Sequence, residues 1–383
     1  MAFDGDGPLN VADYQKLARH RLPAIVWDFL EGGVEDEQGL VYNRSVFDRY
    51  KFEPVRLRDV SRRTIATSLL GHPVAAPLII APTGVNGLFW PQGDLILAQA
   101  AARAGIPFVL STASSMPIAE VAQQSDGDRW FQLYIVRPEF ANALMREALR
   151  YDYSTLVVTV DVTVNGARER DQRNGFGLPM RYSPSIIWDG VRHPRWSMAL
   201  LRNGMPELAN FVRFAGGDPE VQQAVMRREM DASFDWQALK RLRERWPRRL
   251  LVKGILRAAD AAKCVQLGAD GVILSNHGGR QLDALVSPMD VLASTVEAIP
   301  DATVLVDSGF RRGADVVKAL ALGAQGALLG RATLYGLAAA GRVGVDHVID
   351  LLKAEIDRSL ALLGCASVDE LNPAMVCDIR NGK

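Results

Sequence analysis

A histidine and an arginine stand three residues apart in the stretch Ser275-Asn-His-Gly-Gly-Arg-Gln281. The imidazole of His277 can move a proton near neutral pH, and the guanidinium of Arg280 can bind a carboxylate through two hydrogen bonds. The two glycines between them allow close approach of the backbone to other groups. Residues of these types at this spacing indicate a site that oxidises or deprotonates a small acid. A loop closed by a histidine and an arginine is the alternative, and these residues alone leave it open.

The motif follows a short apolar run that predicts a buried strand, and seven similar runs occur elsewhere in the chain. The predicted strands are residues 77–81, 108–111, 130–134, 155–161, 249–253, 271–275, 303–307 and 326–330. Between them lie helical patterns at residues 94–104, 138–150, 235–245, 258–267 and 313–322. Strands that alternate with helices are typical of parallel βα units. Eight such units predict an α/β fold, a closed (β/α)8 TIM barrel.

Polar residues gather where these predicted strands end. They are Pro82-Thr83, Ser111, Gln132, Tyr134, Thr159, Asp161, Lys253, Ser275, His277, Asp307, Gly309, Gly330 and Arg331. In a (β/α)8 barrel all strands end at the same mouth, where active sites are assembled. The sequence therefore predicts that these residues meet in one site.

We expect one domain over the whole chain, residues 1–383. Its predicted parts are an N-terminal helical cap (1–76), the barrel (77–342) with an insertion at about 165–234 after the fourth strand, and a C-terminal helical tail (343–383). In the cap, Pro23 predicts a helix start and Gly32-Gly33 a helix stop. The insertion is longer than an ordinary βα connection and thus predicts a lid or a separate functional segment.

Residues 181–217 of the insertion are rich in large apolar side chains, among them Trp188 and Trp196. The charged residues there are Arg181, Arg192, Arg195, Arg202 and Arg213 against Asp189 and Glu207. An apolar, net-basic segment that bears tryptophan is typical of interfacial membrane binding. A lid that packs on its own barrel or on a neighbouring subunit explains the pattern equally well.

The composition restricts the class of protein. The 383 residues include 44 basic and 44 acidic residues, so no net charge attracts nucleic acid. The 3 cysteines show no metal-ligand or disulfide spacing, which favours a reducing compartment and argues against a metal site. No secretory signal and no apolar run of about 20 residues is evident. We expect a cytoplasmic protein, or one that is peripheral on the inner face of the cell membrane.

The stretch from Ser275 to Gln281 resembles the signature of the FMN-dependent α-hydroxy acid oxidase and dehydrogenase family. The resemblance runs from about Asn10 to Cys365. Its other stretches include Ala81-Pro82-Thr83, Phe131-Gln-Leu-Tyr134, Thr159-Val-Asp161, Leu251-Val-Lys-Gly254, Asp307-Ser-Gly-Phe-Arg-Arg-Gly313 and Gly330-Arg331. The resemblance implies an FMN enzyme that oxidises an (S)-2-hydroxy acid to the 2-keto acid and passes electrons to a quinone-type acceptor or to oxygen. It also implies a homotetramer.

The resemblance implies a role for each residue at the substrate. His277 would be the catalytic base, and Asp161 would hold its imidazole and stabilise the imidazolium. Arg280 would bind the substrate carboxylate, with Arg168 as a second positive charge. Tyr134 would hydrogen-bond the substrate hydroxyl. These residues serve either route of oxidation, because His277 can take the proton from Cα or from the hydroxyl.

The same resemblance places the cofactor. Lys253 would lie beside the flavin N1 and O2 and stabilise negative charge on the ring. Residues Pro82, Thr83, Gly84, Ser111, Gln132, Thr159 and Ser275 would border the ring. The phosphate would bind at Asp307, Gly309, Arg311, Gly330 and Arg331, in the last two βα loops, where such barrels usually hold phosphates.

Three positions bear on the substrate and on the acceptor. Phe29 stands where most members have a tyrosine that helps to hold the substrate carboxylate, and its ring cannot donate that hydrogen bond. Ala113 replaces a bulky tryptophan and so predicts a larger, aromatic acid such as mandelate. Gly84 resembles the dehydrogenase branch. Stretches such as Val164-Asn-Gly and His193-Pro-Arg-Trp-Ser also resemble a membrane-associated branch that oxidises mandelate.

Three alternatives stay open at this point. The first is an oxidase that passes electrons to oxygen and produces hydrogen peroxide. Its substrate would be an aliphatic acid or a ring-hydroxylated mandelate. The second is a barrel lyase or aldolase that uses Lys253 as a Schiff base. The third is a barrel without catalytic activity that binds a membrane or a partner through residues 181–217.

Overall fold

Eight parallel strands form a closed barrel at the centre of the computed structural model, which describes residues 7–177, 183–214 and 230–380. The strands are β4 (Leu78–Ile80), β5 (Phe108–Ser111), β6 (Arg129–Leu133), β7 (Thr155–Thr159), β8 (Arg249–Ile255), β9 (Gly271–Leu274), β10 (Thr303–Val306) and β11 (Gly326–Leu329). Their order round the barrel is β10-β11-β4-β5-β6-β7-β8-β9. The predicted fold is confirmed, and each predicted strand overlaps one of these eight.

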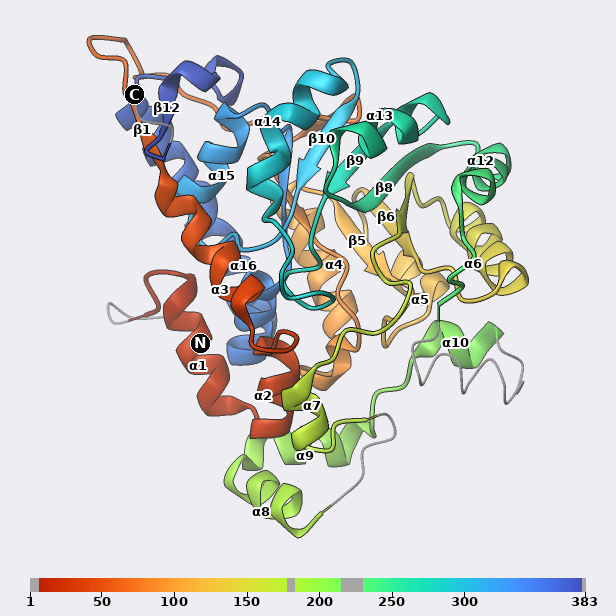
Figure 1. Cartoon of the computed structure of the whole chain (residues 1–383). Coiled ribbons are helices and arrows are strands. Elements are labelled where there is room, and N and C mark those ends of the chain that lie inside the picture. The colour runs from red at the N-terminus through yellow and green to blue at the C-terminus, as the bar shows by residue number, and fades with distance from the viewer. Residues whose placement is uncertain (1–6, 178–182, 215–229, 381–383) are drawn as a thin grey trace.

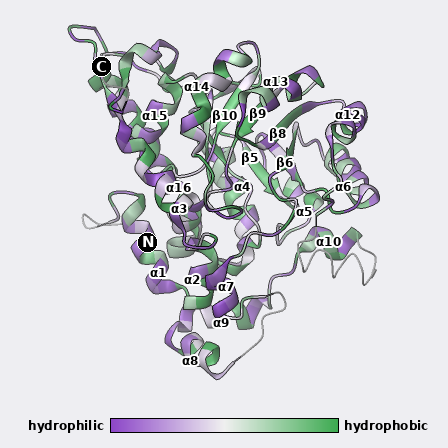
Figure 2. Ribbon diagram, in the orientation of Figure 1, coloured by the Kyte–Doolittle hydropathy of each residue, from purple (hydrophilic) through white to green (hydrophobic). Residues whose placement is uncertain are grey.

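Helices follow the strands and cover the outside of the barrel (Figure 1). They are α4 (Gly93–Ala104), α5 (Ile118–Gln124), α6 (Pro138–Arg150), α12 (Trp236–Arg245), α13 (Ala258–Gln266), α14 (Pro288–Ala298), α15 (Gly313–Ala321) and α16 (Arg331–Leu363). Strands buried on both faces need continuous apolar sequence, and Figure 2 shows hydrophobic residues along strands such as β5 and β9. The alternation of strands and helices in the sequence therefore corresponds to the two layers of the barrel.

One end of the barrel is closed by a short hairpin. Its strands β2 (Thr67–Leu69) and β3 (His72–Val74) are antiparallel, and Leu69, Leu70 and Val74 share an apolar cluster with the barrel interior. Strand residues of that cluster include Ile79, Val109, Trp130, Val157, Leu251, Ile273, Leu305 and Leu328. The interior is filled in this way, and such barrels carry their ligand sites at the carboxyl ends of the strands.

The N-terminal cap is built from helices α1 (Val11–Arg21), α2 (Ala24–Glu31) and α3 (Gln38–Ser45), followed by the 3-10 turn η1 (Val46–Arg49). Helix α2 begins after Pro23 and ends at Gly32, as the sequence predicts. Helix α1 packs along α16, the last barrel helix. The cap thus rests on the barrel and carries α2 to the mouth of the site.

The C-terminal residues return to the cap. Helix α16 is kinked at Ala340 and Gly341, where Gly341 has a φ of +57° and a Cβ would lie 2.6 Å from the ring of Trp90. After α16 come the turns η3 (Val368–Glu370) and η4 (Pro373–Met375), and then β12 (Val376–Asp378), which pairs antiparallel with β1 (Tyr50–Phe52). The predicted boundary between the barrel and the C-terminal tail, at residues 342 and 343, falls inside α16. The division of the chain into these parts stays a prediction.

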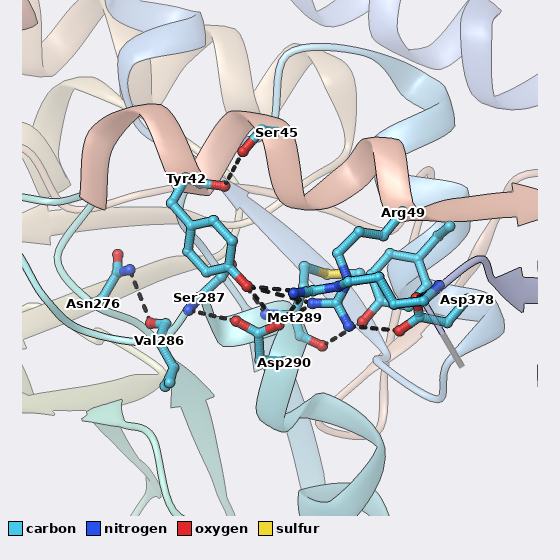
Figure 3. Close-up of polar contacts among 11 residues, drawn as sticks. Tyr42, Ser45, Arg49, Asn276, Val286, Ser287, Met289, Asp290 and Asp378 are labelled. Carbon is cyan, nitrogen blue, oxygen red and sulfur yellow. Dashed lines mark hydrogen bonds and ion pairs between the residues drawn. The ribbon is translucent and has the colours of Figure 1, made fainter. Parts of the chain in front are cut away.

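An ion-pair cluster joins the cap, the barrel and the C-terminal strand (Figure 3). Arg49 bonds to Asp290 in the first turn of α14, and its other terminal nitrogen lies 2.5 Å from Asp378 of β12. Tyr42 donates to the same Asp290 at 3.1 Å, and Tyr50 donates to the carbonyl of Met289 at 3.1 Å. Segments distant in the sequence are therefore held together by partly buried charges.

The insertion after the fourth barrel strand is confirmed, although residues 178–182 and 215–229 of it lie outside the described residues. Its helices are α7 (Glu169–Arg173), α8 (Pro184–Arg192), α9 (Pro194–Asn203) and α10 (Ala209–Phe214). Trp196 is buried and donates to the carbonyl of Leu88 at 2.8 Å, and Phe211 stacks on Phe140 of α6. These two residues belong to the protein interior, as the interpretation of the segment as a lid on its own barrel predicts, and they are not part of an exposed apolar surface.

Candidate active site

A cavity of about 400 Å³ lies at the carboxyl ends of the barrel strands, beneath the cap and the insertion. It is lined by predicted site residues from all of these parts: Phe29, Pro82, Thr83, Gly84, Ser111, Ala113, Tyr134, Arg168, Lys253, His277, Arg280, Asp307, Gly309, Arg311, Gly330 and Arg331. Of the other predicted site residues, Asp161, Gln132 and Ser275 hydrogen-bond to this lining, and Thr159 hydrogen-bonds to Gln132. The structure therefore brings the whole predicted set together.

The loop after β9 adopts an unusual backbone conformation at the cavity wall. His277, Gly278 and Gly279 have φ values of +58°, +66° and +73°, and a histidine in this left-handed region is uncommon. The Oγ of Ser275 accepts from the amide of His277 at 3.0 Å. A Cβ on Gly279 would lie 2.8 Å from the amide nitrogen of Leu40, so the glycine allows α3 of the cap to pack against the loop. The turn thereby holds His277 at the cavity.

His277 is hydrogen-bonded on both ring nitrogens. Its Nδ1 lies 3.0 Å from Asp161 Oδ1, and its Nε2 lies 3.3 Å from the hydroxyl of Tyr134. Because a carboxylate only accepts, Nδ1 carries the proton and the Nε2 lone pair lies on the side of Tyr134. Burial lowers the pKa of His277; Lys253 and Arg168 lower it further, and Asp161 only partly compensates. The imidazole is therefore neutral at neutral pH and can accept a proton.

Asp161 itself stays ionised beside this imidazole. Burial alone would raise its pKa, but the charge and hydrogen bond of His277 and the charge of Lys253 outweigh burial, so the pKa of Asp161 is lowered. Its side chain comes from the segment after β7, and Thr159 at the end of β7 is in register with Lys253 of β8. The barrel register thus brings these charges together.

Arg280 and Phe29 lie at another wall of the cavity. The guanidinium of Arg280 lies 5.4 Å from the centre of the Phe29 ring and donates to the carbonyl of Gly32 at 2.6 Å. The Phe29 ring stacks on Phe176 at 4.3 Å between ring centres and on Phe89 at 6.1 Å. This wall combines a cation that can bind a carboxylate with a broad aromatic face.

Lys253 is a buried ammonium with fixed partners. Its Nζ lies 2.9 Å from Asp307 Oδ2 and donates to Ser275 Oγ at 2.8 Å. Burial by itself lowers the pKa of Lys253, but Asp307 and Asp161 outweigh it and raise the pKa overall. A lysine that keeps its proton is a poor nucleophile, which argues against the Schiff-base alternative.

A chain of hydrogen bonds crosses three neighbouring strands and begins at the lining residue Ser111. Ser111 Oγ donates to Gln132 Oε1 at 3.1 Å, and Gln132 Nε2 donates to Thr159 Oγ1 at 3.0 Å. All three side chains are buried. Because the three side chains bond to one another away from water, each hydrogen bond between them has a fixed direction. Such fixed donors and acceptors suit a site that recognises the polar edge of a ring.

Two arginines and two glycines at the ends of β10 and β11 form a pocket suited to a phosphate. Arg331 is partly buried and donates to the carbonyls of Leu30 and Gly278, while Arg311 donates to the hydroxyl of Tyr335 at 3.3 Å. Burial lowers the pKa of Arg331, although Tyr335 and Glu31 partly offset this, and the charge of Arg311 lowers it further. Two guanidiniums that line one cavity are groups that bind a phosphate.

The same pocket leaves room for that anion. Gly330 caps the N-terminus of α16, and a Cβ on it would meet no side-chain atom closer than 4.0 Å. A helix N-terminus of this kind presents free amide groups to an anion. With Lys253 farther along the cavity, the residues fit a cofactor that carries a ring and a phosphate, as FMN does.

Several cavity residues were not predicted from the sequence. They are mainly apolar side chains: Phe89, Val162, Phe176, Leu208, Phe211 and Met230. Most of them come from the insertion and nearby loops, whose packing no periodic pattern reveals. Ser308 was also missed; its hydroxyl donates to Asp307 at 2.7 Å and accepts from Gly278 at 3.1 Å. It follows a strand end directly, which is a signal that could have identified it.

Among the described residues no cluster of His, Cys, Asp or Glu could hold a metal ion. In the same part of the chain no helix has the length and apolar character needed to cross a membrane.

Comparison with known proteins gives consistent matches over almost the whole chain. The family model for FMN-dependent dehydrogenases matches residues 18–378. The chain is 58% identical over 364 residues to (S)-mandelate dehydrogenase of Pseudomonas putida, covering 95% of this chain and 92% of that protein. It is 39% identical to L-lactate oxidase of a Nostoc species, covering 96% and 98%. A crystal structure of the monotopic membrane protein (S)-mandelate dehydrogenase superposes with a TM-score of 0.94 at 57% identity, covering 97% of this chain and all 100% of the other.

Proposed function

From the premise that the chain belongs to the FMN-dependent dehydrogenase family, we propose that it oxidises an (S)-2-hydroxy acid, with an aromatic acid such as mandelate as its substrate, to the 2-keto acid. The observation that carries this proposal is the neutral His277 between Asp161 and Tyr134, in one cavity with Arg280 and Lys253. A base beside a cation is what oxidation of a small hydroxy acid requires.

His277 moves the proton in this reaction. The Nε2 lone pair accepts a proton from the substrate, and the imidazolium that results is stabilised by Asp161 at Nδ1. The Tyr134 hydroxyl, 3.3 Å from the same Nε2, is placed to hydrogen-bond the substrate oxygen next to the reacting carbon. FMN, when bound, accepts the two electrons that leave the substrate.

Arg280 and Arg168 orient the substrate. Both line the cavity that His277 lines, so a carboxylate bound between them holds the neighbouring carbon near the imidazole. Lys253 supplies a fixed positive charge that favours negative charge on the cofactor ring. Arg311, Arg331 and the backbone at Gly330 would hold the cofactor phosphate.

The remaining wall of the cavity favours an aromatic substrate. Phe29, Phe89 and Phe176 form one stack, and Ala113, which lines the same cavity, takes little space. Aromatic rings stack on such a surface with a gain of about 0.5–1.5 kcal/mol beyond the burial of area. One of the relatives is consistent with this wall, since (S)-mandelate dehydrogenase is named for an aromatic acid.

We also propose that the insertion attaches the enzyme to a membrane. Helices α8 and α9 lie at the edge of the molecule, beyond the cap (Figure 1), and expose Ile187, Trp188, Val191, Met198 and Leu201. The side chain of Trp188 is 66% exposed and that of Leu201 is 85% exposed. Arg192, Arg195 and Arg202 lie on the same helices and would face anionic lipids.

A membrane position would give access to a quinone, which is the electron acceptor that we favour over oxygen. The location on the inner face of the cell membrane is part of this proposal, and the homotetramer stays a prediction.

Anaerobic bleaching of the flavin tests the reaction. (S)-Mandelate is expected to bleach the yellow absorption of the holoenzyme at a higher kcat/KM than lactate, and admitted air is expected to restore the colour only slowly. The substitution His277→Ala is expected to slow bleaching by about 10²- to 10⁴-fold, the usual contribution of a general base. The exposed histidine His20 serves as the control, and His20→Ala should leave the rate unchanged. A His277→Ala enzyme that kept most of its rate would contradict the proposal.

A further inference from the structure

A buried carboxylate at the start of α4 is not used by the reaction described above. Asp94 lies in the first turn of α4 and is 0% exposed. It accepts hydrogen bonds from Asn86 Nδ2 at 2.7 Å, from the amide of Ser115 at 2.9 Å and from the Ser115 hydroxyl at 2.6 Å. Burial raises the pKa of Asp94 to about 6, and these hydrogen bonds limit the rise, so the group is charged at neutral pH.

The charge of Asp94 determines the direction of the next hydrogen bonds. A carboxylate only accepts, so the amide nitrogen of Asn86 must be the atom that faces it. The other end of that amide, Oδ1, then faces Thr83 Oγ1 at 2.9 Å. Because an amide oxygen only accepts, the Thr83 hydroxyl must donate its single proton to Asn86. Three residues thus form a chain with one allowed direction.

The loop that carries this chain is held in a strained conformation. Val85 has a φ of +56°, although a β-branched residue rarely adopts the left-handed region. Its amide donates to the carbonyl of Ala113 at 2.9 Å, and a Cβ on Gly93 would lie 2.4 Å from the carbonyl oxygen of Asn86. Backbone strain of this kind persists where surrounding contacts hold it, and it concentrates at functional sites.

Thr83 lines the cavity, between Pro82 and Gly84 at the end of β4. Since its proton is committed to Asn86, its hydroxyl can offer the cavity only a lone pair. We propose that Asp94 is a positioning residue, which acts through Asn86 to hold the Thr83 hydroxyl as a hydrogen-bond acceptor toward the flavin. This inference rests on the placement of FMN in the cavity under the proposed function.

The consequence is a preference for the reduced cofactor. In this proposal, the ring edge at Thr83 is the one that gains an N–H donor when the flavin is reduced. A hydroxyl that can only accept stabilises the ring that has this donor. A threonine free to rotate would donate to the oxidised ring as readily as it accepts from the reduced one. The chain from Asp94 to Thr83 therefore raises the reduction potential of the bound flavin.

The test measures the reduction potential of the purified holoenzyme against a reference dye. Thr83→Val keeps the shape of the side chain and removes the hydroxyl, and it is expected to lower the equilibrium constant for reduction about tenfold, which is about 30 mV for a two-electron couple. Thr83→Ser should keep the wild-type potential. Asp94→Asn should lower the potential, and combined with Thr83→Val it should add nothing, because both variants interrupt one chain.

Controls separate this role from a structural one. Thr295 is a buried threonine of α14 whose hydroxyl donates to Val291, so Thr295→Val should leave the potential unchanged. If Asp94→Asn does not fold, Asn86→Ala interrupts the chain in the same way and should shift the potential in the same direction.

An unchanged potential in Thr83→Val, or additive shifts in the double variant, would overturn the inference. A protein that holds no FMN, or whose flavin no 2-hydroxy acid reduces, would instead overturn the proposed function.

Discussion

At the scale of single residues, His277 shows how burial and charge prepare a base. Burial, Lys253 and Arg168 lower its pKa, and Asp161 opposes them. The catalytic form is the neutral imidazole, so kcat/KM should fall as the pH drops through a pKa that lies below the ordinary histidine value of about 6.5. Above that pKa the activity should reach a plateau.

The substitution Asp161→Asn separates the two contributions of this carboxylate. Because Asp161 raises the pKa of His277, its neutralisation should move the acid limb of the profile to lower pH. Because Asp161 also stabilises the imidazolium, the plateau should fall by about 10- to 100-fold, the loss expected for a hydrogen bond to a charged group. A pH profile of kcat/KM from about 4 to 9 measures both effects. A limb that moved to higher pH would contradict this account of the pair.

Phe29 is the residue at which this chain departs from the tyrosine of most family members. It lies in the wall beside Arg280, so Phe29→Tyr should place a donor near the substrate carboxylate. We expect KM for mandelate to fall about tenfold with little change in kcat, since a hydrogen bond to a charged group contributes about 1.5–3 kcal/mol. Steady-state kinetics measure this change. Phe89→Tyr, in the same aromatic stack, is the matched control and should not lower KM.

At the scale of elements, the insertion divides its apolar residues between two tasks. Trp196 and Phe211 pack on the barrel, whereas Trp188 and Leu201 are exposed. One side of the segment therefore packs on the barrel, and the other side exposes the apolar residues on which the proposed membrane contact rests. Leu208 and Phe211 connect the insertion to the active site, because they belong to the insertion and line the cavity.

Serine at three exposed positions tests the membrane contact. The triple variant Trp188→Ser, Val191→Ser and Leu201→Ser should bind anionic vesicles at least about a hundredfold more weakly, since each large apolar side chain buried contributes about 1.5–3 kcal/mol. Flavin reduction by mandelate should be unchanged. Sedimentation with vesicles measures binding.

The control for this experiment places serine at exposed apolar positions outside the insertion. Val41 and Leu362 are 63% and 64% exposed, and their substitution should leave binding intact. Equal loss of binding in both sets, or in neither, would count against the insertion as the membrane contact.

At the scale of the whole molecule, the cluster at Arg49 joins the cap, α14 and the C-terminal strand (Figure 3). Its side chains are 17% exposed at Arg49, 18% at Asp290 and 14% at Asp378. Arg49→Ala should lower the free energy of unfolding by about 1.5–3 kcal/mol, because Asp378 loses its arginine and Asp290 is left with the longer ion pair to Arg380. Urea unfolding followed by circular dichroism measures this change.

Arg58 provides the comparison for a surface pair. It lies 3.2 Å from Glu370, with side chains 56% and 34% exposed, so Arg58→Ala should cost less than about 1 kcal/mol. Similar losses in both variants would show that the Arg49 cluster behaves as an ordinary surface ion pair.

Much of this protein could be predicted from short stretches of sequence. The alternation of apolar runs with helical patterns was sufficient for the eight-stranded barrel, because each βα unit is formed largely by local sequence. The polar residues at strand ends, such as Lys253, His277 and Asp307, could be placed in one site without knowledge of their contacts. The reason is geometric: a closed parallel barrel brings every carboxyl end to the same mouth.

Other features of this protein could be known only from the tertiary structure, because they depend on residues that are far apart in the chain. Trp188 and Trp196 read alike in the sequence, and only packing against Leu88 buries the second of them. Phe176 meets Phe29 through the path of the insertion, which follows no periodic pattern. Arg49 meets Asp378 across 329 residues. The residue types in the sequence determined the chemistry, but burial and the direction of each hydrogen bond arise only when distant segments exclude water from the same place.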